Sequence, residues 1–380
     1  MKKVWYAPHR FEMYGEEEIK AVEKCLRDGW LAGTGPQTES FEKIVAERFG
    51  KKNGLFVNSG SSANLVALAS LNLPAGSCIV TPACTFATTV APIIQLGHVP
   101  VFCDVGLTQY VPSVEQVMEK VDKNTRVVLL PNLIGNVPNW LGLRQALHEM
   151  GRDDVILFED SADTITLGKH SDVSTTSFYS SHIITAGGTG GMAMFNDNAH
   201  LARATMYRDW GRVGNNVEDM SSRFGHSIDG IPYDFKFTYA VMGYNLKCSE
   251  MNAAFGIVQM SRLEDNIQRR RRNFLRYIHN LKTCSHIVLP DDERSPNWLA
   301  MPLQYTGNRM KLLQYLEDNQ VQTRVTFSGN ITRHDAFKQY QGAFSNSDDI
   351  MRRGFLVGCH HGMSEGDVDY VCDKIISFCA

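Results

Sequence analysis

The sequence predicts an α/β protein built on a mostly parallel sheet that helices cover on both faces. Short apolar runs, typical of buried strands, alternate with helical segments from residue 54 to residue 195, as in a series of βαβ units. The composition, 43% hydrophobic and 21% charged residues, is that of a globular protein. At 380 residues, the chain is long enough for one large domain and a smaller one.

Two helices, at 15–29 and 39–49, are expected before the first strand, and both end at or beside a glycine. The expected strands are 54–57, 78–81, 99–103, 126–130, 155–158 and 192–195. The helical stretches between them are 61–71, 86–96, 113–120 and 141–150. Ligands of such sheets bind at the carboxyl ends of the strands, so the residues that follow each strand are the candidates for a site.

The alternation ends after residue 195. The stretch 211–232 is polar and bears glycine and asparagine, which indicates a loop. Residues 249–272 have an amphipathic pattern that predicts a long helix, which would bridge to a C-terminal domain. We therefore expect a large cofactor-binding domain over residues 1–255 and a small domain over residues 256–380.

Charge and cysteine content exclude several classes of protein. A formal net charge of -3 gives no electrostatic basis for binding nucleic acid or an anionic membrane. The nine cysteines are dispersed and form no Cys-x-x-Cys pair, which favours reduced thiols. The N-terminal residues turn acidic before any apolar signal segment forms, and no run approaches the length of a membrane span. We expect a cytoplasmic protein.

Polar residues follow two of the expected strands, and a third polar segment leads into a glycine run. The segment NSGSSAN at 58–64 opens a helix, so Gly60 and Ser61 would form part of a phosphate cup, unless the segment is an ordinary serine-rich cap. Asp160 ends a buried strand and needs a cationic or proton-bearing partner, such as a pyridinium nitrogen, a basic side chain or a metal. Ser177 and His182 precede a glycine run at 185–191, but one histidine among twelve is more often structural.

The order of these segments resembles the DegT/DnrJ/EryC1 family, the pyridoxal phosphate (PLP)-dependent aminotransferases and dehydratases of nucleotide sugars. The matching segments are NSGSSAN (58–64), TPACTF (81–86), EDSAD (159–163), SFYSSH (177–182), RDWGR (208–212), GYNLK (243–247) and the residues 323–333. Several ordered motifs across nearly the whole chain are more specific than any single one. The resemblance implies aminotransferase fold type I, with a mixed, mostly parallel sheet between helices in the large domain and a smaller C-terminal α+β domain.

The resemblance also implies which residues bind the cofactor. Gly60 and Ser61 would bind its phosphate, joined by Ser177. Phe86 would stack on the pyridine ring, although as an isolated residue it would be assigned to the core. Asp160 would pair with the ring nitrogen.

Five further residues fall at matching positions. Asp163 lies where many relatives have a glutamine near the ring 3-hydroxyl. Asn245 would reach the phosphate of the neighbouring subunit's cofactor, which implies a homodimer with shared active sites. The segment 323–333 carries cationic and amide donors suited to binding a sugar diphosphate, namely Arg324, Asn330 and Arg333. Each of these residues alone is nearly as well explained as a surface residue of the small domain.

The chain departs from the aminotransferases of the family at residue 182. They have a lysine there that forms a Schiff base with the cofactor, whereas this chain has His182. Lys169 is the nearest substitute, but it is expected in a loop before the strand that carries Ser177. Imidazole cannot form a stable aldimine, yet it moves protons near neutral pH, which suits an enzyme that works from pyridoxamine phosphate (PMP).

A subgroup of the family, the nucleotide-sugar 3-dehydratases, shares this replacement. We therefore expect a PMP/PLP-dependent dehydratase that removes the 3-hydroxyl of a 4-keto-6-deoxy nucleotide sugar, with His182 as the base. The CDP-sugar members use an iron–sulfur cluster, but the loop 213–222 has no cysteine, so we expect no cluster and glutamate as amino donor. The alternatives are a nucleotide-sugar aminotransferase with an unrecognised lysine, or a catalytically silent member that binds a sugar nucleotide.

Overall fold

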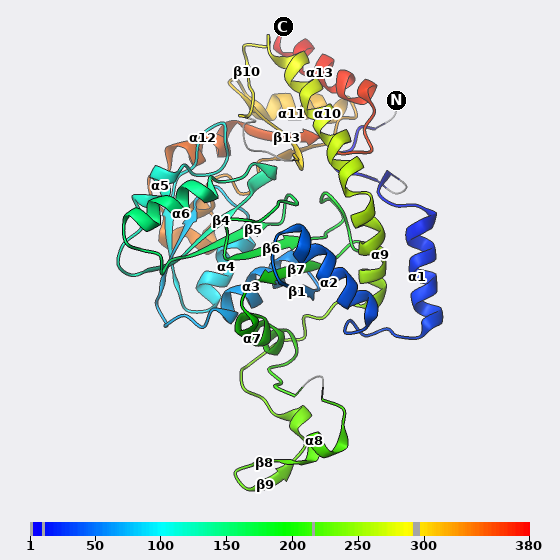
Figure 1. Ribbon diagram of the computed structural model, residues 1–380. Coiled ribbons are helices and arrows are strands. Elements are labelled where there is room, and N and C mark those ends of the chain that lie inside the picture. Colours follow the sequence, from blue (N-terminus) through cyan, green and yellow to red (C-terminus); the bar gives the residue numbers. More distant parts are fainter. Residues whose placement is uncertain (1–2, 10–11, 215–216, 292–296) are drawn as a thin grey trace.

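The computed structural model describes residues 3–9, 12–214, 217–291 and 297–380 and contains two main sheets (Figure 1). The larger sheet has seven strands in the order β1-β7-β6-β5-β4-β2-β3. These are β1 (Asn53–Val57), β2 (Cys78–Pro82), β3 (Val99–Cys103), β4 (Thr125–Pro131), β5 (Ile156–Ser161), β6 (Val173–Ser177) and β7 (Gly191–Phe195). Strands β2 to β6 pair in parallel, whereas β7 is antiparallel to both β1 and β6. The predicted mixed, mostly parallel sheet is confirmed.

Both faces of this sheet are buried because its strands alternate between two apolar cores. In β4, Val127 and Leu129 pack with residues of α3 and α7, while Val128 and Leu130 pack with residues of α5 and α6. The helices of this part are α1 (Glu16–Asp28), α2 (Pro36–Arg48), α3 (Gly60–Ser70), α4 (Ala87–Gln95), α5 (Val114–Met118), α6 (Trp140–Glu149) and α7 (Asn198–Arg208). The carboxyl ends of β1, β4, β5 and β6 meet at one edge of the sheet, where a ligand site is expected.

The central strand β6 has the sequence VSTTS, and all five residues are buried. Ser174 donates a hydrogen bond to the Glu159 carboxylate at 2.9 Å, and Thr175 donates to the Asn64 side chain at 2.6 Å. Thr176 donates to a main-chain carbonyl of β5 at 2.9 Å. A strand with no apolar run is therefore stable at the centre of the sheet, because its buried hydroxyls have partners.

The smaller sheet is antiparallel, in the order β10-β11-β13-β12. Its elements are β10 (Ile287–Val288), β11 (Ala300–Tyr305), α11 (Arg309–Asp318), β12 (Thr323–Val325), α12 (Ser345–Arg353), β13 (Gly354–Gly358) and α13 (Glu365–Cys379). The long helix predicted at 249–272 is two helices, α9 (Glu250–Ser261) and α10 (Leu263–Leu281), because the backbone turns at Arg262. The predicted domain boundary falls inside α9 and stays a prediction.

The stretch 211–232 was predicted as a loop, and residues 215–216 of it lie outside the described residues. The described part contains regular structure. It holds α8 (Met220–Phe224) and the hairpin of β8 (His226–Ile228) and β9 (Ile231–Tyr233), and Figure 1 shows this segment extending away from α7 and the rest of the chain. Asp229 and Gly230 turn the hairpin with φ of 50° and 81°, as a type I′ turn requires. We call residues 217–243 the arm.

The arm exposes large apolar side chains. Met220 is 74% exposed and Met242 is 94% exposed.

None of the helices in the described residues has the length and apolar character needed to cross a bilayer.

Candidate active site

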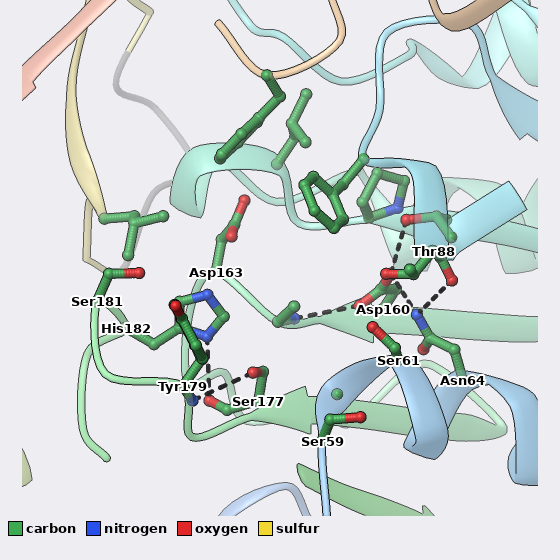
Figure 2. Close-up of a pocket in the computed structure, with 18 of the residues that line it drawn as sticks. Ser59, Ser61, Asn64, Thr88, Asp160, Asp163, Ser177, Tyr179, Ser181 and His182 are labelled. Carbon is green, nitrogen blue, oxygen red and sulfur yellow. Dashed lines mark hydrogen bonds between the residues drawn. The ribbon is translucent and has the colours of Figure 1, made fainter. Parts of the chain in front are cut away.

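A cavity of about 620 Å³ lies where the ends of β5 and β6 meet the N-terminus of α3 (Figure 2). Its volume is within the range of small-molecule sites. The structure brings eight of the predicted residues onto its wall, namely Gly60, Ser61, Phe86, Asp160, Asp163, Ser177, His182 and Arg324.

One end of the cavity is the N-terminus of α3. Ser59 caps the helix, because its hydroxyl accepts a hydrogen bond from the Ser62 amide at 3.1 Å. A Cβ atom at Gly60 would lie 2.6 Å from the Cβ of Ser177, so glycine is needed for β6 to approach the helix. The first amides of a helix have no intrahelical acceptors. Together with the hydroxyls of Ser61 and Ser177, they form a cup suited to an anion such as phosphate.

Asp160 lies on the cavity wall beside α3, buried at the end of β5 (Figure 2). Its carboxylate accepts hydrogen bonds from Asn64 and Thr89, both at 2.8 Å, and from the Ala162 amide at 3.2 Å. All three donors are neutral, and burial raises the pKa of Asp160. A cationic ring nitrogen that carries a proton would stabilise the carboxylate here.

The part-buried Asp163 accepts a hydrogen bond from the Ile134 amide at 2.8 Å. Ile134 has φ of 60°, a left-handed conformation that is unusual for a β-branched residue. Burial raises the pKa of Asp163 to about 7, opposed by the Ile134 hydrogen bond and assisted by repulsion from Asp160. Near neutral pH, the Asp163 side chain is therefore able either to donate or to accept a hydrogen bond, as a glutamine amide does.

His182 is held by the turn that follows β6. Its amide donates to the Tyr179 carbonyl at 3.0 Å, and its Nδ1 lies 3.3 Å from the Ser177 carbonyl oxygen. A carbonyl oxygen only accepts, so Nδ1 carries the proton and Nε2 the lone pair. Burial lowers the pKa of His182 to about 4, opposed by the bond to Ser177 and assisted by the cation of Arg270. At neutral pH, the imidazole of His182 is a proton acceptor.

Phe86 and Arg324 complete the wall of the cavity. Phe86 precedes α4, is 53% exposed and meets Phe327 edge-on with ring centroids 6.1 Å apart. An exposed aromatic face suits stacking on a planar ring. The guanidinium of Arg324 lies 5.4 Å from the ring centroid of Tyr6 and gives this side of the cavity a cation.

Asn330 and Arg333 do not line the cavity. Asn330 is buried and its amide donates to Asp348 at 2.7 Å, while its oxygen accepts from Thr332. Arg333 forms an ion pair with Asp348. The contacts of both residues are explained by local structure, so nothing in the geometry supports the predicted contact with substrate.

Asn245 and Lys169 also lie outside the cavity. Asn245 is exposed beside Asp209, with which it forms an antiparallel bridge. Lys169 is exposed near Gly50. Of the described residues that line the cavity, none is a lysine.

Several residues of the site were not predicted from the sequence, and four of them carry polar groups that bear on its chemistry. Asn64 and Thr89 bind the Asp160 carboxylate, and Tyr6 and Tyr179 line the cavity. Asn64 ends the NSGSSAN segment, a signal that could have been used, because it returns to the site one helical turn after Gly60. Tyr6 is far from the other residues in sequence and has no such signal.

The residues of this cavity fit a pyridine ring that bears a phosphate. The cup at α3 suits the phosphate, the face of Phe86 suits the ring, and the buried carboxylate of Asp160, which has only neutral partners, suits a protonated ring nitrogen. In the part of the chain that the structure describes, no group of three or more His, Cys, Asp or Glu side chains is placed to hold a metal ion.

Residues 12–376 match the sequence profile of the DegT/DnrJ/EryC1/StrS aminotransferase family. The lipopolysaccharide biosynthesis protein RfbH of Salmonella typhimurium is 31% identical over 98% of this chain and 91% of its own. The dTDP-4-dehydro-2,6-dideoxy-D-glucose 3-dehydratase of Saccharopolyspora spinosa is 33% identical over 96% of this chain and 84% of its own. The structure of the E. coli GDP-4-keto-6-deoxy-D-mannose-3-dehydratase with bound hydrated PLP superposes with a TM-score of 0.87 at 23% identity, covering 98% of this chain and 100% of that one. The predicted fold type I is confirmed.

Proposed function

The chain belongs to the DegT/DnrJ/EryC1/StrS aminotransferase family, and we propose that it removes the 3-hydroxyl of a 4-keto-6-deoxy nucleotide sugar. Family membership makes it a PLP-dependent, sugar-modifying enzyme, and the dehydration is our proposal. One observation carries it. The cavity wall has His182 where a Schiff-base lysine is expected, and no described lysine lines the cavity. A relative that is 33% identical and named a 3-dehydratase supports the same reaction.

Bound PMP would supply an amine for the 4-keto carbon and a ring that withdraws electrons from it. Asp160 would keep a proton on the ring nitrogen, because a buried carboxylate favours a cationic partner. His182 accepts a proton at Nε2, and its Nδ1–H bond to the Ser177 carbonyl holds the ring in one orientation. His182 would take this proton from carbon and pass it to the 3-hydroxyl, which would leave as water as the C3–O bond breaks.

Glutamate is the proposed amino donor that restores the amine form of the cofactor. An iron–sulfur cluster needs four thiolates gathered at one site. The nine cysteines of this chain are dispersed over its length, and none lies between residues 104 and 247. We therefore propose a route without a cluster. The exposed Arg324 on the cavity wall would supply a cation for the sugar diphosphate.

We also propose a homodimer with shared active sites. Asn245 is exposed and lies outside the cavity of its own chain, and the apolar side chains of the arm need a covering surface. Mixing His182→Asn protein with Asn245→Ala protein under conditions of subunit exchange tests this, because a hybrid dimer would contain one intact site. Activity that returns on mixing supports shared sites. No return, with exchange shown by mass spectrometry, would overturn them.

The reaction is tested by incubating the protein with PMP and a panel of 4-keto-6-deoxy nucleotide sugars, with and without glutamate, and following products by mass spectrometry. We expect loss of the 3-hydroxyl, with multiple turnovers only when glutamate is present. His182→Asn should abolish it, because the asparagine amide keeps a donor for the Ser177 carbonyl but has no basic nitrogen. His148→Asn, at an exposed histidine, is the matched control. A product that gains an amino group would contradict the proposal and favour an aminotransferase.

A further inference from the structure

Behind His182 lies a fully buried arginine, Arg270 of α10, with 0% of its surface exposed. Its Nη2 donates to the His182 carbonyl oxygen at 3.3 Å. Its Nη1 donates to the carbonyl oxygens of Trp298 and Leu299 at 3.2 and 2.9 Å. One guanidinium thus joins the turn that carries His182 to the segment before β11.

This cation has no carboxylate partner among the described residues. Its acceptors are three main-chain carbonyls, and its Nε has no hydrogen-bond partner. A buried charge without a counter-ion is expensive, and burial lowers the pKa of Arg270 only to about 10. The guanidinium therefore remains charged at neutral pH. An apolar residue would fill the same space at lower cost, so its charge calls for an explanation.

The surroundings of His182 supply one. The titratable groups that line the cavity with it are Tyr6, Asp160, Asp163, Tyr179 and Arg324. Ionised carboxylates among them would favour a protonated imidazole. Burial is the main cause of the low pKa of His182, and Arg270 is the cation that acts in the same direction, against the protonated form.

We propose that Arg270 is a positioning residue for the reaction, a buried cation that fixes the His182 backbone and keeps the imidazole free to accept a proton. The proposal rests on the proposed role of His182 as the base. Leu299 lines the same cavity, and its amide donates to the Ile134 carbonyl at 2.8 Å. Arg270 therefore ties together two parts of the cavity wall that come from different sheets.

Two variants separate charge from geometry. Arg270→Met keeps much of the side-chain volume and removes the charge. Arg270→Lys keeps the charge, but its single ammonium cannot reproduce the planar fork that reaches three carbonyls. Arg309→Met is the matched control, because Arg309 also donates to two main-chain carbonyls and also has an Nε without a partner, at a part-buried position outside the cavity.

The first readout needs no turnover. The holoenzyme labelled with ¹⁵N-histidine is titrated by NMR, and the His182 signals are assigned by their loss in His182→Asn. We expect Arg270→Met to raise the midpoint of His182 by about one unit, whereas Arg309→Met and Arg270→Lys leave it unchanged. An unchanged midpoint in folded Arg270→Met would overturn the role of the charge, whether or not the protein is a dehydratase.

The second readout is turnover in the dehydration assay. We expect Arg270→Lys to lower kcat about tenfold with KM little changed, because the backbone of the base is misplaced while substrate contacts remain. Turnover of Arg270→Lys equal to that of the wild-type protein would overturn the positioning role, and this variant decides the matter if Arg270→Met does not fold. An absence of dehydration in the wild-type protein would count against the proposed function and leave the titration result standing.

Discussion

Replacing Asp163 by asparagine should stabilise the protein increasingly as pH rises. The folded-state pKa of Asp163 is raised from 3.8 to about 7. A raised carboxyl pKa means that stability is fully present below pH 3.8 and is lost as pH rises through about 7. Between pH 5.5 and 8.5 these two values correspond to a loss of about 2 kcal/mol. Because Asp163 is only part-buried, screening by solvent reduces this to about 1 kcal/mol.

Asparagine keeps an oxygen for the Ile134 amide but does not ionise, so it should escape this loss. Urea unfolding of the cofactor-free protein at pH 5.5 and at pH 8.5 measures the effect. The advantage of Asp163→Asn over the wild-type protein should grow by about 1 kcal/mol between the two pH values. The exposed Asp373→Asn is the control and should show no such growth. A constant or shrinking advantage would refute a raised pKa at Asp163.

Three further predictions concern the same cavity. Asp160→Asn should weaken cofactor binding by about 10- to 100-fold, which is the effect of losing one hydrogen bond to a charged group. Fluorescence titration with PLP measures this affinity, and an unchanged affinity would show that Asp160 does not face the ring nitrogen. Gly60→Ala should destabilise the fold by about 1–3 kcal/mol, because the new Cβ atom would clash with Ser177. Gly366→Ala should not, because a Cβ atom there would meet no atom closer than 3.9 Å. Equal urea midpoints for Gly60→Ala and the wild-type protein would contradict the close packing of β6 on α3. The pH profile of kcat/KM should show no loss of the His182 base between pH 7 and 5, because protonation of His182 is expected only near pH 4. An acid limb near pH 6.5 that persists in Asp163→Asn, and so cannot come from that carboxyl, would contradict the lowered pKa of His182.

Hydrophobic patterns predicted most of the sheet. The expected strand 99–103 coincides with β3, and the other expected strands differ from those observed by a few residues at their ends. These strands are buried on both faces, so their apolar runs stand out from the sequence around them. The strand β6 has no such run, because its burial depends on hydrogen bonds to side chains that are distant in sequence.

The arm shows a different limit. The Asp229-Gly230 pair is a hairpin signal, but the flanking strands of three residues each are too short to give an alternating pattern. Regular structure was therefore hidden in a polar stretch.

The site was partly predictable, because a shared motif order brings residues to one edge of the sheet. Gly60, Asp160 and His182 line one cavity as the motifs suggested. Asn330 belongs to an equally clear motif, yet its side chain caps a turn. Arg270 gave no signal, since a basic residue in the run Arg269–Arg272 is expected on a solvated helix face. Burial of one member of that run is decided by tertiary packing alone.

The polar strand β6 has a consequence for how the chain finds its native register. In an apolar strand, a slip along the neighbours by two residues returns similar side chains to each face and is only weakly penalised. In β6, any slip would separate Ser174 from Glu159 and Thr175 from Asn64. Each buried hydroxyl left without a partner costs about 1–3 kcal/mol, so a slipped strand would lose much of the 5–15 kcal/mol that typically holds a domain folded. Misaligned forms are thereby disfavoured during folding, and Ser177 arrives opposite the N-terminus of α3 as soon as the sheet closes.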